Sequence, residues 1–126
     1  MSTAWYIVLE QEIPGFDHGV NGKSLSRAGT ALDGLAGEIG IEPLMSFFST
    51  SQDDLRAFSE EVDIPLPQEK WFSAERGLQT VEALIERVRE ADIDRKEDVM
   101  KDLGDFHRVL TTAKGHGIRW HLAIDY

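Results

Sequence analysis

The chain contains no cysteine, only four prolines and no long run of apolar residues. A secreted domain of this size is usually held together by disulfides, so the lack of cysteine favours a reducing compartment. No segment approaches the roughly 18 apolar residues that a membrane helix needs. The first residues also lack the basic and apolar regions of a signal peptide. We therefore expect a cytoplasmic protein that does not contact a membrane.

Basic residues are scarce as well, because 13 Lys and Arg stand against 23 Asp and Glu, for a net charge of −10. The excess lies in residues 1–93, whereas residues 94–126 carry equal numbers of acidic and basic side chains. An acidic surface repels nucleic-acid phosphates and anionic lipids, so we expect neither as a partner. It suits a basic protein partner. A solvated acidic surface that only keeps the chain soluble explains the same charge.

Length and composition predict one domain over residues 1–126. Hydrophobic residues make up 41% of the chain and charged residues 29%, which is ordinary globular content. A single domain of this length buries a core without disulfides, whereas two domains would each be too small.

Both ends of the chain are predicted to be β-strands. Residues 5–10 are β-branched and aromatic, and residues 118–126 alternate between apolar and polar side chains. A lone strand leaves its backbone unpaired, so the two strands are expected to pair in one small sheet. One face of this sheet would be apolar and pack against helices: Trp5, Ile7, Leu9, Trp120, Leu122 and Ile124. The other face, which includes His121 and Ala123, is expected to be exposed to solvent.

About four amphipathic helices are predicted between the strands, which makes the fold class α+β. Their caps and apolar stripes occupy residues 25–39, 51–62, 73–88 and 94–113. Ser73 is the expected N-cap of the third helix and Asp94 that of the fourth, which Gly115 or Gly117 ends. A short helical turn is expected over residues 44–48, after Pro43.

Three segments resemble a family of small, uncharacterised bacterial proteins: Pro43–Ser49, Trp71–Val81 and His121–Tyr126. The segments carry mostly core and capping residues. The resemblance implies a bacterial source and no particular catalytic activity.

The segment Asp17–Ser24 ends in Gly-Lys-Ser, as phosphate-binding loops do. Asp17 stands where such a loop has its first glycine, and the nearby Glu10 and Glu12 would repel a phosphate. We interpret the segment as a turn and helix start. The four histidines show none of the spacings typical of metal ligands, so we expect neither a metal site nor a cofactor.

Acid–base chemistry has four candidate residues: Glu10, His18, His121 and Asp125. His121 and Asp125 share one face of the last strand at a separation of roughly 13 Å. If the strands pair, Glu10 or Tyr6 could lie between them, and the loop that carries His18 would be nearby. A solvent-facing sheet explains the same residues without chemistry.

Trp71 and Phe72 are candidate binding residues, because they form an apolar pair between an acidic, proline-rich loop and a helix start. The alternative is that Phe72 packs on Leu78 and fixes the entry to that helix.

Three functions remain open at this level. The first is a protein-interaction module, such as an immunity protein or an inhibitor of a basic toxin, and it fits the acidic charge and the lack of a catalytic motif best. The second is a structural subunit that forms a homodimer through unpaired sheet edges. The third is a small enzyme that uses the acid–base residues above.

Overall fold

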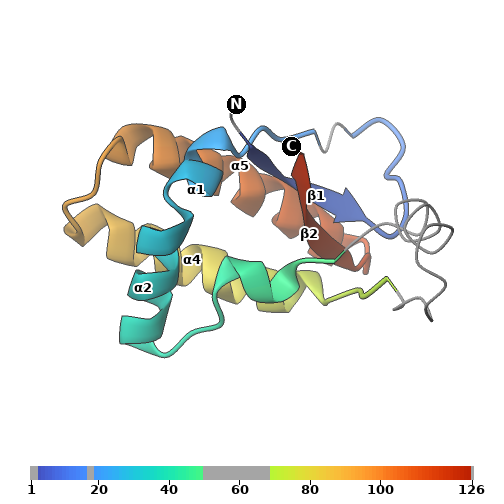
Figure 1. Cartoon of the computed structure of the whole chain (residues 1–126). Coiled ribbons are helices and arrows are strands. Elements are labelled where there is room, and N and C mark those ends of the chain that lie inside the picture. Colours follow the sequence, from blue (N-terminus) through green and yellow to red (C-terminus); the bar gives the residue numbers. More distant parts are fainter. Residues whose placement is uncertain (1–2, 17–18, 50–68, 126) are drawn as a thin grey trace, which may run out of the picture.

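A small antiparallel sheet packs against a group of helices (Figure 1). The computed structural model describes residues 3–16, 19–49 and 69–125. Strand β1 (Ala4–Leu9) pairs with β2 (Trp120–Asp125) in antiparallel register. Trp5 lies opposite Ile124, and Ile7 opposite Leu122. The predicted α+β class and the pairing of the two chain ends are confirmed.

Strand β2 has neighbours on both of its edges. On the edge away from β1, Phe72 and Trp120 exchange two backbone hydrogen bonds of 2.8 and 2.9 Å. Further along the same edge, the Ser49 N–H donates to the Leu122 carbonyl at 3.1 Å. β2 is therefore the central segment of the sheet, although β1 is its only full partner strand among the described residues.

Four α-helices and one 3₁₀-helix are described: α1 (Lys23–Arg27), α2 (Gly29–Ile39), η1 (Leu44–Phe47), α4 (Ala74–Glu90) and α5 (Lys96–Gly115). The long helices α4 and α5 lie side by side (Figure 1). The Ser73 hydroxyl accepts the Arg76 N–H at 3.2 Å, so the predicted cap of α4 is confirmed. The helix predicted over residues 51–62 lies outside the described residues.

Two helix boundaries were predicted wrongly. The stripe at residues 25–39 is not one helix but two, separated at Ala28. At the break, the Trp5 ring packs so close to Gly29 that a Cβ there would lie 3.0 Å from it. Helix α5 starts at Lys96, with Arg95 rather than Asp94 in the N-cap position. Arg95 has a left-handed backbone (φ 55°), which turns the chain into the helix without a side-chain cap.

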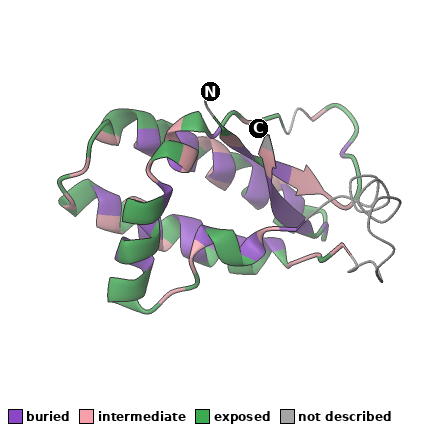
Figure 2. Ribbon diagram, viewed as in Figure 1, coloured by how far each residue is buried: buried purple, intermediate pink, exposed green. Residues whose placement is uncertain are grey.

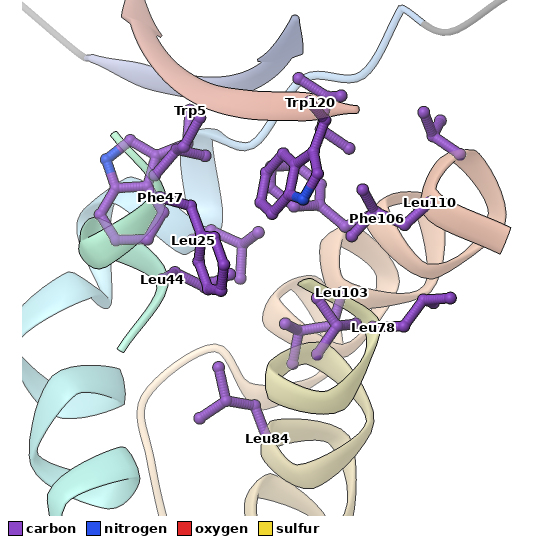
Figure 3. Close-up of a cluster of buried hydrophobic side chains, with 14 of the residues drawn as sticks. Trp5, Leu25, Leu44, Phe47, Leu78, Leu84, Leu103, Phe106, Leu110 and Trp120 are labelled. Atoms are coloured by element: carbon purple, nitrogen blue, oxygen red, sulfur yellow. The ribbon is translucent and has the colours of Figure 1, made fainter. Parts of the chain in front are cut away.

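The core lies between the sheet and the helices, and Figure 3 shows Trp5 and Trp120 directed from the sheet into it. Trp120 has no exposed surface, and its ring stacks on Phe47 at 5.1 Å between centroids. Its indole N–H donates to the Ser73 carbonyl at 3.1 Å. Because a buried indole N–H needs an acceptor, this bond fixes the ring against the start of α4.

On β2, the second face of the sheet is buried rather than exposed to solvent, contrary to prediction, whereas Tyr6 on the same face of β1 is 36% exposed. His121 is 0% exposed and Ala123 7%, so β2 is buried on both faces (Figure 2). The alternation of residues 118–126 correctly assigned Trp120 and Leu122 to the apolar face. It could not reveal that Glu69 and Trp71 cover the opposite face at His121.

Candidate functional site

His121 lies at the centre of a largely buried polar contact. Its Nε2 is 2.6 Å from a Glu69 carboxylate oxygen, and its Nδ1 is 3.1 Å from the Leu122 carbonyl oxygen. The Trp71 ring packs beside the imidazole at 4.8 Å between centroids. The Glu69 side chain is only 12% exposed. Strand β2 and the segment of residues 69–71 therefore enclose this histidine.

The two oxygens determine where the protons of His121 lie. A carbonyl oxygen can only accept, so Nδ1 carries a proton and donates it to Leu122. At Nε2, one further proton bridges the imidazole and the Glu69 carboxyl group. The ring is thus satisfied on both sides, and its full burial leaves no surface for a substrate. We interpret the pair as a link between residue 69 and β2.

The other predicted acid–base residues do not join His121 among the described residues. Of the two residues predicted between His121 and Asp125, Tyr6 lies opposite Ala123, whereas Glu10 lies beyond His121 and bonds to Arg119. Glu10 forms an ion pair with Arg119, and the hydrogen bond from Arg119 lowers the pKa of Glu10. Asp125 pairs with Ala4 through the strand register, but its side chain is outside the description, as is His18.

Trp71 and Phe72 are half-buried and make contacts within the chain. Phe72 meets Phe47 edge to face at 5.3 Å, and the Arg76 guanidinium lies 5.7 Å from the centroids of both rings. Trp71 covers His121, as described above. Both aromatic side chains thus contribute to the packing around β2.

Asp102 is a buried polar residue that the sequence analysis missed. It lies on α5, yet its carboxylate accepts the N–H groups of Ser24 at 3.0 Å and Leu25 at 3.3 Å. It therefore caps α1 from a different helix. Burial raises the pKa of Asp102, and the two N–H donors offset this only in part. The available signal was an acidic residue next to the apolar stripe of the fourth predicted helix.

A cleft of about 810 Å³ runs along β1. It lies between β1 and the following loop and is lined by Ala4, Tyr6–Leu9, Gln11, Glu12, Gly19–Asn21 and Lys23. No three side chains of the described residues converge in the way that a metal ion requires.

Comparison with known proteins finds no family model, no curated protein and no solved structure that matches the chain. In the described part of the chain, no helix combines the length and the apolar character needed to cross a bilayer.

Proposed function

We propose that this chain is a protein-interaction module that binds a basic protein partner. The observation that carries the proposal is a group of exposed carboxylates around the turn between α4 and α5. Five acidic residues in this turn and in the adjoining ends of the two helices make no ion pair in the described structure: Glu90, Asp92, Asp94, Glu97 and Asp98. We call this group the acidic turn.

The two basic residues within the same stretch balance the acidic turn only partly. Arg95 is exposed, and the Lys96 ammonium donates to the Arg89 carbonyl. Unpaired carboxylates that gather in one place on an acidic protein attract a cationic surface and repel anionic ones. This favours a basic protein over a nucleic acid or a membrane as the partner.

The arrangement of the acid–base residues supports binding over catalysis. His121 is buried against Glu69, and Glu10 is held by Arg119. A general acid or base must reach the proton that it transfers, and neither side chain has a free position to do so in this arrangement.

The test measures how salt affects the capture of a basic protein by the immobilised full chain. The measurement is then repeated with variants in which acidic residues are replaced by lysine. A basic partner should bind at low ionic strength and be released as salt screens the charges. The double variant Asp92→Lys/Asp94→Lys should weaken binding by about tenfold or more.

The matched control is Asp33→Lys/Glu75→Lys, which changes the net charge equally at exposed residues elsewhere. It should weaken binding by less than about threefold. Equal losses in the two variants, or binding that salt does not affect, would contradict the proposal.

A further inference from the structure

We propose that the outer edge of β1 binds an extended segment of the partner polypeptide, which adds as a strand beside Ile7 and Leu9. This inference rests on the proposed function, and it states where and in which conformation the partner binds.

In an antiparallel pair, successive residues direct their N–H and C=O groups alternately toward the partner strand and away from it. The Glu10 N–H donates across to β2, whereas Trp5 exchanges hydrogen bonds of 3.2 and 2.9 Å with Gly22 on the opposite edge. Ile7 and Leu9 lie two and four residues after Trp5, so their backbone groups point in the same direction as those of Trp5. Their backbone groups therefore point to the outer edge.

The bonds of β2 lead to the same conclusion. Leu122 and Trp120 lie opposite Ile7 and Leu9, and their backbone bonds go to segments beyond the far edge of β2. Within the described chain, no hydrogen bond reaches the outward N–H and C=O groups of Ile7 and Leu9. Two donors and two acceptors thus repeat at the spacing of a strand, about 6.6–6.8 Å per residue pair. Another extended backbone matches this spacing.

The cleft of about 810 Å³ lies along β1. Its opposite wall is formed by residues 19–21, where the loop returns to meet β1 at Gly22. A second copy would carry the same wall beside its own β1, so the two walls would keep the β1 edges apart. A single extended segment has no such obstacle, which makes a peptide segment the occupant.

Charges at the two ends of the cleft set the direction of this segment. Glu12 lines the end near Leu9 and Lys23 the end near Trp5, and neither side chain has an ion-pair partner in the described chain. A segment antiparallel to β1, like the bridge at Gly22, would begin near Glu12 and end near Lys23. The favoured partner segment is therefore extended, with a basic residue at its N-terminal side.

The probe is a synthetic peptide, Lys-Thr-Val-Thr-Val-Thr-Glu, titrated into the isotope-labelled full chain. In the free chain, the amides of Ile7 and Leu9 should exchange with solvent at least about tenfold faster than the Val8 amide, which faces β2. Peptide binding should slow the exchange of both. A control peptide with methyl groups on the nitrogens that face β1 keeps the sequence and charge but should bind about tenfold more weakly.

Two variants of Leu9 isolate the backbone contribution. Leu9→Pro removes the outward N–H without removing a bond to β2, whereas Leu9→Ala removes a similar apolar contact and keeps the N–H. Peptide affinity should fall about tenfold or more for Leu9→Pro and by less than about threefold for Leu9→Ala. If Leu9→Pro does not fold, the methylated peptide alone decides.

Three results would overturn the inference: slow exchange of Ile7 and Leu9 in the free chain, equal binding of the methylated peptide, or protection that appears only with a concentration-dependent dimer. A basic protein that binds Leu9→Pro normally but not Asp92→Lys/Asp94→Lys would overturn the edge site and leave the proposed function intact. Peptide binding at β1, with no basic protein captured by the chain, would overturn the proposed function and leave the edge site intact.

Discussion

At the scale of single residues, the packing of Trp120 depends on the absence of a side chain at Gly77. A Cβ on Gly77 would lie 2.5 Å from the indole ring, which is shorter than any normal contact. The ring cannot move away easily, because it stacks on Phe47 and donates to the Ser73 carbonyl. A glycine inside α4 is therefore required by the tertiary structure, although it weakens the helix itself.

We expect Gly77→Ala to lower the free energy of unfolding by about 1–3 kcal/mol, because the added methyl group overpacks the core. The control is Gly104→Ala in α5, where a Cβ meets nothing within 4 Å. That variant should instead stabilise the chain by about 0.5–1 kcal/mol through its higher helix propensity. Urea unfolding measures both values, and a stabilising Gly77→Ala would show that the Trp120 packing is wrong.

Asp102 gives a stability term that depends on pH. Because burial raises its pKa, the folded chain keeps the Asp102 proton to a higher pH than the unfolded chain does. The resulting stabilisation is fully present below the unfolded-state pKa of about 3.9 and is lost as pH rises through the raised pKa. Asp102→Asn does not titrate. The stability of the natural chain relative to Asp102→Asn should therefore fall as pH rises above about 4 and level off above the raised pKa.

Urea unfolding of both chains across this pH range checks the sign, and a difference that grows in favour of Asp102 with pH would contradict it. Asp102→Ala serves as the reference for the cap, since it leaves the Ser24 and Leu25 N–H groups without their acceptor. It should cost about 1–3 kcal/mol.

At the scale of elements, residues 69–72 lie alongside β2 and bind to it through two kinds of contact. Phe72 pairs with Trp120 through the backbone, and Glu69 binds His121 through its side chain. The His121 side of the second contact is fully buried, and the Glu69 side chain is only 12% exposed. The strand and this segment should therefore depend on each other.

We expect Glu69→Ala to lower the free energy of unfolding by about 1–3 kcal/mol, because it leaves the buried Nε2 of His121 without a partner. The chain offers a matched control in the exposed pair of Glu82 and His107, whose side chains are 61% and 38% exposed. Glu82→Ala should cost only about 0–1 kcal/mol. Equal losses in urea unfolding would mean that His121 does not depend on Glu69.

At the scale of the whole molecule, the residue pattern alone determined the strands at the chain ends, their pairing and the side of the sheet that meets the helices. These features follow from alternation and helical periodicity, which act between neighbours in sequence. The Ser73 cap is local in the same way, because hydroxyl and N–H are three residues apart.

Only the tertiary structure decided the break at Ala28, the burial of His121 and the cap that Asp102 provides. Each depends on a contact with a segment far away in sequence: Trp5 against Gly29, Glu69 against His121, and Asp102 against the start of α1. A sequence pattern states which face of an element is apolar, but it does not state which distant side chain will reach that face. The open edge of β1 belongs to the same class, because the path of the returning loop determines which of its backbone groups stay unpaired.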